Sequence, residues 1–185
     1  MLGNDIVDLK KAAEDSNWRR KGYLNKICTA PEQHLILTAD NPSAMLWLIW
    51  SMKEASYKVI NRLTGIRSYS PRSYVCSNLR LNGSQASASI TFGHCTMFNT
   101  AELREEMIHS VAVLKKEEQQ YVKTYPLSNS AGYMDDFNQA CPEYLLSKTP
   151  AGLPQITYLP ASRTSEASVS HHGRYAAIVY SDFPR

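Results

Sequence analysis

The sequence predicts an α+β fold in which a mostly antiparallel sheet packs against one long central helix. The run from Asn41 to Leu63 places apolar residues at helical spacing and has helix start and stop signals at its ends. The segments after it are rich in Ser, Tyr, Val and Ile, and they include Asn82-Gly83, a pair that favours the tight turns of antiparallel hairpins. A helix followed by antiparallel strands is the pattern of an α+β domain.

Length and composition indicate one soluble globular unit. The chain has 185 residues, which is enough for one domain or two small ones with a sizeable core, and we expect a single domain over residues 1–185. An apolar content of 43% and a charged content of 20% are ordinary for this class. The net charge of +3 is too mild to indicate a nucleic-acid partner, but it suits a phosphate-bearing ligand or an acidic protein.

The cysteines and the N-terminus indicate a reducing cytoplasm. No Cys-x-x-Cys pair and no zinc-finger spacing occurs, so reduced thiols are expected at Cys28, Cys76, Cys95 and Cys141. Acidic residues stand early in the chain, where a signal peptide would be apolar. No apolar run approaches the roughly 18 residues of a membrane span. We therefore expect a cytoplasmic protein with no membrane partner.

The first nine residues predict a short strand with one unusual member. Asp5 stands among apolar neighbours, where a carboxylate is disfavoured. It is tolerated with a buried structural partner, or when it faces water, caps an element or binds a cation. The residues alone leave these alternatives even.

Residues 10–27 are basic, with Trp18 and Tyr23 interleaved among Lys10, Lys11, Arg19, Arg20, Lys21 and Lys26. Such a stretch can bind phosphates, but it is more often a solvated helix face. Thr29 and Glu32 form the pattern of a capping box, which predicts a helix from there to about Leu37.

The central helix carries the residues of greatest interest. Asn41 or Ser43 can cap its start, and Gly65 can end it in a left-handed conformation. One predicted face is apolar, with Met45, Ile49, Met52, Val59, Ile60 and Leu63, and another carries Trp47, Ser51, Glu54, Lys58 and Arg62. Spacing alone favours an ordinary Glu54–Lys58 surface pair, which stabilises a helix by only about 0.2–0.5 kcal/mol.

The remaining elements follow from turn residues and alternation. We expect a hairpin with strands at 74–81 and 84–92, and a strand rather than a helix at 108–113. A helix is predicted around residues 134–147, followed by a strand at 156–159 and a strongly apolar strand after a turn at Gly173.

Three stretches together resemble the 4′-phosphopantetheinyl transferase superfamily. That family has an early Gly-x-Asp strand, a central helix with the pattern Trp/Phe-Ser/Ala-x-Lys-Glu-Ala/Ser-x-x-Lys, and a Ser-x-Ser-His segment. The corresponding stretches here are Gly3 to Leu9, Trp50 to Lys58 and Ser168 to Tyr175. The central match is the specific one, and it runs through Trp50, Ser51, Lys53, Glu54, Ala55 and Lys58.

The order of these stretches resembles the holo-acyl-carrier-protein synthase type. The Ser-His segment comes last, Val7 stands two positions after the early Asp, and Gly152-Leu153-Pro154 is similar to that type's Gly-x-Pro. Two features depart from it. Asn4 replaces a usually apolar residue, and the chain is longer, with an expected insertion at about 93–149. The compact type is a homotrimer, so the oligomer here is left open between homotrimer and monomer.

The resemblance implies transfer of the 4′-phosphopantetheine arm of coenzyme A to a serine of an apo acyl or peptidyl carrier protein, releasing adenosine 3′,5′-bisphosphate. It implies Mg²⁺ bound by Asp5 and Glu54, since hard cations take oxygen ligands. Lys58 would stabilise charge on the phosphates and bind coenzyme A. Glu54, or a metal-bound water held by it, would be the base.

Other residues take lesser roles by the same resemblance. Ser170 and His171 would bind coenzyme A, His171 at the 3′-phosphate, and His172 would be a bystander. Asp8 and Lys53 have supporting roles, with Lys53 either binding a phosphate or holding structure. Contacts to an acidic carrier protein would come from Arg19, Arg20, Lys21 and Lys26.

Two alternatives of a different class remain. One is a coenzyme A-binding module without catalysis, and the other is an accessory protein of a biosynthetic pathway. The presence of both candidate metal ligands, Asp5 and Glu54, disfavours a pure binder. The pathway served, whether fatty-acid, polyketide or peptide synthesis, is not indicated.

Overall fold

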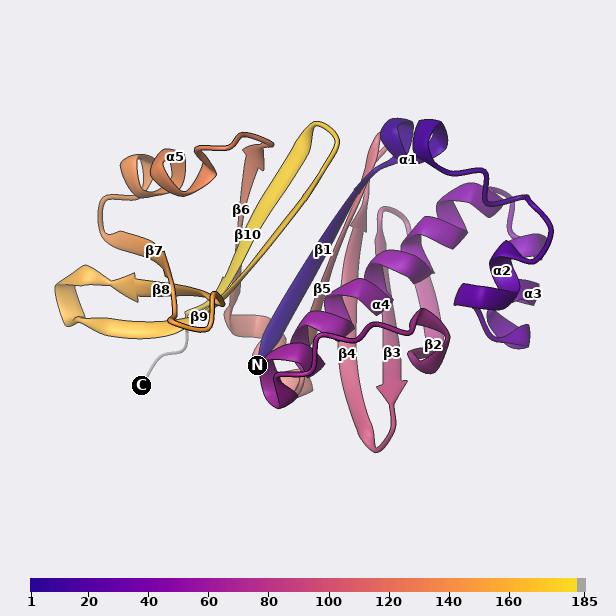
Figure 1. Cartoon of the computed structure of the whole chain (residues 1–185), viewed down its shortest axis with the longest axis horizontal. Coiled ribbons are helices and arrows are strands. Elements are labelled where there is room, and N and C mark those ends of the chain that lie inside the picture. The colour runs from indigo at the N-terminus through magenta and orange to yellow at the C-terminus, as the bar shows by residue number, and fades with distance from the viewer. Residues whose placement is uncertain (183–185) are drawn as a thin grey trace.

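The computed structural model describes residues 1–182, and its strands there form two five-stranded antiparallel sheets (Figure 1). The first sheet has the order β1-β5-β4-β3-β2 and the second β6-β10-β9-β8-β7. Their bounds are β1 Leu2–Asp8, β2 Val75–Asn82, β3 Gln85–Phe92, β4 Cys95–Leu103, β5 Met107–Val113, β6 Val122–Ser128, β7 Tyr144–Lys148, β8 Pro154–Tyr158, β9 Arg163–His172 and β10 Tyr175–Ser181. The predicted α+β class is confirmed.

The α-helices of the described residues lie mostly on the first sheet. They are α1 Leu9–Asp15, α2 Tyr23–Ile27, α3 Ala30–Thr38, α4 Pro42–Thr64 and α5 Tyr133–Ala140, and three short 3₁₀ turns cover residues 71–73, 116–121 and 159–161. The long helix α4 crosses the face of the first sheet, with α1, α2 and α3 gathered near its N-terminal end (Figure 1). No helix among the described residues is long and apolar enough to cross a membrane.

Helix α4 begins and ends where the sequence predicts. The Asn41 Oδ1 atom accepts the Ala44 N–H at 3.0 Å, and Gly65 adopts a left-handed φ of 73°. Its predicted two-faced character was wrong in part: Trp47 and Ser51 are buried, whereas Leu63 is 42% exposed. The reason is that this side of α4 is also covered: the Ser51 hydroxyl faces β1, where it donates to the Asp5 carbonyl oxygen, and Trp47 lies near α1 and Trp18.

The close approach of β1 to α4 depends on Gly3. A Cβ atom added there would overlap the Ala55 carbonyl oxygen and would lie 2.9 Å from the Lys58 Cβ. Only a residue without a side chain therefore fits between the strand and the helix at this level. Because alternate residues of a strand point to the same face, Asp5 faces α4 as Gly3 does.

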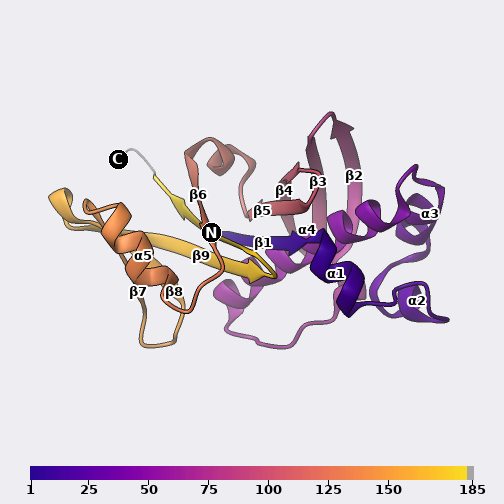
Figure 2. The ribbon, with the colours of Figure 1, turned by 90° about the horizontal axis from the view of Figure 1, so that it is seen from above.

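The second sheet meets the first along β1. Strand β9 lies beside β1 on the side away from β5, and Figure 2 shows the two running next to each other. The Asn4 side chain is fully buried there, and its Nδ2 group donates to Ser170 Oγ at 2.8 Å. The Asn4 backbone N–H donates to Ser168 Oγ at 3.1 Å. A polar residue at position 4 therefore binds the serines of β9.

In the middle of the chain, the secondary structure differs from the prediction in one place. The predicted helix around 134–147 stops at Ala140, and residues 144–148 form β7, which pairs with β8. Pro142 accounts for the stop, because the residue before a proline is disfavoured in a helix. The expected insertion at about 93–149 contains β4 and β5, and β5 pairs directly with β1.

Gly3→Ala should lower the free energy of unfolding by about 1–3 kcal/mol, because the added methyl group overpacks the β1–α4 contact. Urea unfolding followed by circular dichroism measures this. Gly132→Ala is the matched control, since a Cβ there meets only Asp136 Oδ1 at 4.0 Å and φ is −92°. Equal stability of the two variants would contradict the close-approach argument.

Candidate active site

Strand β1 and helix α4 bring together the three residues singled out by the sequence. Asp5 projects from β1 toward α4, on which Glu54 and Lys58 lie one turn apart. The Lys58 Nζ atom is 3.9 Å from Asp5 Oδ1. Ser51, one turn before Glu54 on α4, donates from its hydroxyl to the Asp5 carbonyl oxygen at 3.4 Å. The two candidate metal ligands and the candidate phosphate-binding lysine therefore share one site.

Lys58 also connects the two sheets. Its Nζ group donates to the Asn4 carbonyl oxygen of β1 at 2.7 Å and to the Val169 carbonyl oxygen of β9 at 3.3 Å. Burial lowers the pKa of Lys58, whereas the carboxylates of Asp5 and Glu54 oppose that shift. The ammonium group is thus held at a fixed place where α4, β1 and β9 meet.

The two carboxylates are destabilised as anions. Burial, followed by the nearby Asp5 carboxylate, raises the pKa of Glu54 to about 7. Burial also raises the pKa of Asp5, with Lys58 and then other neighbours, His172 among them, opposing it. A divalent cation between two such groups would relieve their repulsion.

The ligand set at this position is small. Among residues 1–182 no cluster of three or more His, Cys, Asp or Glu side chains is arranged to hold a metal ion. Asp5 and Glu54 supply two carboxylates, so a cation held by them would keep several waters or take further oxygens from a bound ligand. Mg²⁺ prefers oxygen ligands and usually keeps several of its waters, so two carboxylates fit it.

The two adjacent histidines of β9 point to opposite faces. His172 accepts the Asp8 N–H on its Nδ1 atom at 3.0 Å and lies on the face toward β1, together with Ser170. Ser170 is buried and accepts from Asn4. His171 is exposed on the other face. His172, expected to be a bystander, is thus a direct partner of the strand that carries Asp5.

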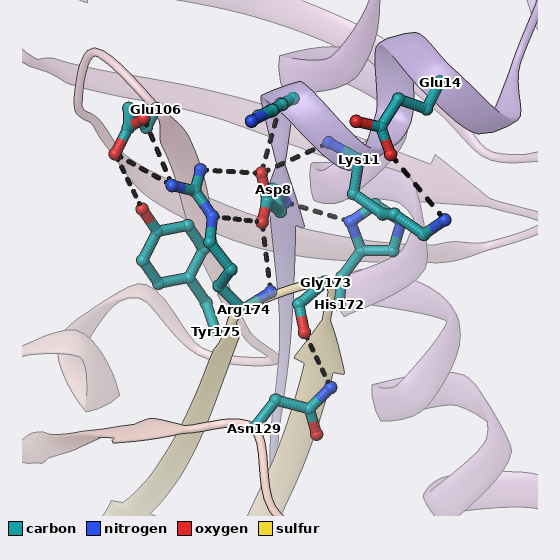
Figure 3. Close-up of polar contacts among 10 residues, drawn as sticks. Asp8, Lys11, Glu14, Glu106, Asn129, His172, Gly173, Arg174 and Tyr175 are labelled. Atoms are coloured by element: carbon teal, nitrogen blue, oxygen red, sulfur yellow. Dashed lines mark hydrogen bonds and ion pairs between the residues drawn. The ribbon is translucent and has the colours of Figure 1, made fainter.

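Asp8 holds the tip of the β9–β10 hairpin on the end of β1 (Figure 3). The Arg174 guanidinium donates to both oxygens of Asp8, at 2.8 and 3.0 Å, and the Arg174 backbone N–H adds a third bond at 3.0 Å. These bonds hold the pKa of the Asp8 carboxyl well below its usual range. Asp8 also accepts the N–H groups of Lys10 and Lys11 at the start of α1, so it acts as a structural link.

Lys53 lies in the core and not beside Glu54. Its ammonium forms a buried ion pair with Glu32 Oε2 at 2.7 Å and donates to the Ile27 carbonyl oxygen at 2.9 Å. Both side chains are at most 1% exposed. Of the two roles left open for Lys53, the structure supports the structural one: it ties α4 to α3 and to the end of α2. Access to a phosphate is blocked by this burial.

The basic residues before α3 form an exposed group of their own. The Arg19 guanidinium lies 4.3 Å above the Trp18 ring, and Arg20 lies 5.2 Å from the Tyr23 ring. Arg19, Arg20 and Lys21 line a hollow of about 310 Å³, and Lys26 is exposed in the last turn of α2. The cluster is therefore accessible to an acidic partner, at the α2–α3 end of the molecule (Figure 1).

Comparison with known proteins decides the family. The family model of the 4′-phosphopantetheinyl transferase superfamily matches residues 1–109, which is more than half of the chain. The chain belongs to the 4′-phosphopantetheinyl transferase superfamily. The matched region contains β1 and α4, and with them Asp5, Glu54 and Lys58.

Among solved structures, this superfamily member is similar to the crystal structure of Thermotoga maritima holo-[acyl-carrier-protein] synthase. The sequence identity is 14% and the TM-score 0.45, over 85% of this chain and 83% of that one. A comparison with curated protein sequences finds no match.

Sequence reasoning assigned no role to two arginines that link separate parts of this superfamily member. Arg62, one turn after Lys58, donates to the carbonyl oxygens of Pro154 and Ala167 and so binds α4 to the second sheet. A cavity of about 180 Å³ lies between Lys58, Arg62 and β9. For Arg62, the four-residue spacing from Lys58 was a usable signal, because it places both residues on the same side of α4. Arg174 offered no such signal, because its partner Asp8 lies 166 residues earlier.

The raised pKa of Glu54 predicts a pH-dependent stability in the superfamily member without metal. Ionising Glu54 costs more in the folded than in the unfolded state, so its contribution is favourable below its ordinary pKa of 4.5 and is lost as pH rises to about 7. In chelator, wild type should therefore lose stability relative to Glu54→Gln across that range, and the difference should level off above it.

Urea unfolding at a series of pH values measures this difference. Glu105→Gln is the control, since Glu105 is exposed and its replacement should leave the pH profile unchanged. A Glu54→Gln difference that stays constant from pH 4.5 to 7 would show that the carboxyl is not destabilised as argued.

Proposed function

We propose that this protein transfers the 4′-phosphopantetheine arm of coenzyme A to a serine of an apo acyl or peptidyl carrier protein, with Mg²⁺, and releases adenosine 3′,5′-bisphosphate. The observation that carries the proposal is the meeting of Asp5, Glu54 and Lys58 where β1, α4 and β9 join. These are the residues that match the family's motif positions, and they come from separate segments of the chain.

Asp5 and Glu54 would hold the cation. Their shared burial makes two adjacent negative charges unfavourable, and the pKa of Glu54 is raised by burial and by the Asp5 charge. Mg²⁺, when bound, would neutralise charge on the pyrophosphate. The remaining sites around the ion would be filled by water and phosphate oxygens.

The transfer step needs a base near the attacking serine. The serine Oγ of the carrier forms a bond to the phosphorus that bears the pantetheine arm, and the bond from that phosphorus to the bridging oxygen breaks. The serine proton passes to Glu54, directly or through a water that it holds.

Lys58 would stabilise the charge that develops on the leaving adenosine 3′,5′-bisphosphate. Its ammonium is already fixed by two backbone carbonyl groups, so little reorganisation is needed when the phosphates bind. Its lowered pKa comes from burial, and the two carboxylates beside it favour the charged form.

Coenzyme A would also contact the third motif. His171 is exposed on β9 and is the candidate for the 3′-phosphate. Ser170 is buried and bonded to Asn4, so its contribution would be to fix the position of this strand. The carrier protein would dock on the basic group around α2, where electrostatic complementarity adds rate and selectivity.

A coenzyme A-binding or accessory protein without catalysis is the alternative. It would bind coenzyme A but leave the carrier unmodified. The presence of both candidate metal ligands, Asp5 and Glu54, beside Lys58 favours the transferase, because a pure binder has no need of both. The oligomer, whether homotrimer or monomer, is a separate question for solution sizing.

Mass spectrometry of a panel of apo carrier proteins, incubated with coenzyme A, Mg²⁺ and this protein, tests the proposal. At least one carrier should gain the mass of the arm, and chelator should abolish the gain. Glu54→Gln should reduce the rate about 100-fold or more, within the range for losing a general base.

The exposed Glu105→Gln variant is the control and should retain the wild-type rate. Full activity of Glu54→Gln, or full activity in excess chelator, would overturn the mechanism. Binding of coenzyme A without modification of any carrier in the panel would favour the alternative.

A further inference from the structure

A cavity of about 680 Å³ lies between β1 and β5 of the first sheet and β6 and β10 of the second. Ile6 lines it, and since successive residues of a strand point to opposite faces, the cavity is on the side of β1 away from Asp5 and α4. Its volume is typical of a small-molecule site. The cavity is therefore separate from the candidate active site, on the reverse face of the same strand. The apolar part of its wall comes from Ile6, Met107, Pro126, Leu127, Ala176 and Ala177.

His109 is the buried polar residue of this cavity, with 7% of its surface exposed. Its Nε2 atom lies 3.2 Å from Asn4 Nδ2. An amide nitrogen only donates hydrogen bonds, so Nε2 accepts and the ring proton is on Nδ1. Burial lowers the pKa of His109 to about 4, so the ring is neutral near pH 7. His109 therefore has a fixed tautomer whose Nδ1–H group is a donor.

The Nδ1–H donor of His109 has no acceptor among residues 1–182. Unlike Asn4 Oδ1, the Nδ1 atom is not closed off from solvent by protein atoms. Because the ring lines the cavity, this accessible donor opens into it. A hydrogen bond made in such a sheltered place is stronger than one made at the surface. The cavity thus combines apolar walls with one directional polar contact.

The charges at the mouth of the cavity oppose an anion. Glu102, Glu105 and Glu106 line the cavity together with Arg104. Arg104 pairs with Glu102 at 2.9 Å, and Glu106 pairs with Arg174, as Figure 3 shows. Glu105 is exposed and has no ion pair among the described residues, so the mouth carries excess negative charge.

We propose that this cavity is a second small-molecule site, for an uncharged molecule with an apolar body and a carbonyl oxygen that accepts the His109 Nδ1–H. The apolar walls would bury the body of the ligand, and a carbonyl oxygen accepts a hydrogen bond without carrying charge. A carboxylate at that place would meet a neutral ring and the acidic mouth, and an ammonium group would meet another donor. The inference goes beyond the proposed function and does not depend on it.

Benzamide is the probe, with benzoate and benzylamine as charged counterparts of similar size, titrated into ¹⁵N-labelled protein and followed by NMR. Benzamide should shift the amide signals of Ile6, His109 and Ala177, and it should bind about tenfold more tightly than either charged compound. His109→Phe keeps a planar ring but removes the donor, so benzamide affinity should fall about 3–10-fold. Asn4 Nδ2 retains Ser170 Oγ and the Ala177 carbonyl oxygen as acceptors in this variant.

A second variant, Thr124→Trp, closes the cavity from an exposed position of β6 and decides the question even where His109→Phe fails to fold. It should abolish the benzamide shifts. Lys123→Trp is the matched control, since the neighbouring residue is exposed on the opposite face of β6, and it should bind benzamide as wild type does.

Four results would overturn the inference. Benzamide causes no shifts in wild type, or it binds folded His109→Phe or Thr124→Trp as tightly as wild type. Benzoate or benzylamine binds as tightly as benzamide, which removes the argued preference for an uncharged ligand. Coenzyme A with Mg²⁺ displaces benzamide, which shows that the amide occupies the substrate site. Absence of carrier modification by wild type would refute the proposed function and leave these binding results decisive for the cavity.

Discussion

The contact between β1 and α4 at Gly3 is the constraint on which the rest of the structure depends. Without a side chain at this position, the strand lies directly against the helix backbone at Ala55. That spacing lets the Lys58 side chain, which is anchored on α4, reach carbonyl oxygens of β1 and β9. It also places Asp5 near Glu54. The raised pKa values of both carboxyl groups therefore depend on this close approach of β1 to α4.

Polar groups, and not only apolar ones, join the two sheets. Asn4 is fully buried and binds Ser170, and its Nδ2 atom lies 3.2 Å from His109 Nε2 on β5. Asp8 and Arg174 form a second connection at the hairpin tip. Buried hydrogen bonds have directional requirements that apolar contacts lack, so they set the register of β9 against β1. The position of the third sequence motif is thereby defined.

Local signals predicted most of the first half of the fold. The caps of α4, the Asn82-Gly83 hairpin and the strand containing Asp5 depend on neighbouring residues, and all three are confirmed. The burial of Lys53 depends on Glu32, 21 positions away, and no local pattern reveals it. The grouping of Asp5 with Glu54 was expected only through the family resemblance. Tyr69 lies on an irregular loop after α4, and neither periodicity nor spacing predicts its ring contact with Tyr57.

The attachment of β9 and β10 to β1 has a consequence for how the molecule folds. The hydrogen bonds of Asn4 with Ser168 and Ala177 join residues 164 and 173 positions apart. Contacts between residues so far apart in the sequence form late, because the entropy cost of closing a long loop comes before the contacts stabilise the fold. The first sheet with α4 can therefore assemble early, from residues that are synthesised first. Lys58 acquires its Val169 partner only after the C-terminal hairpin has docked, so a half-made chain lacks the complete site.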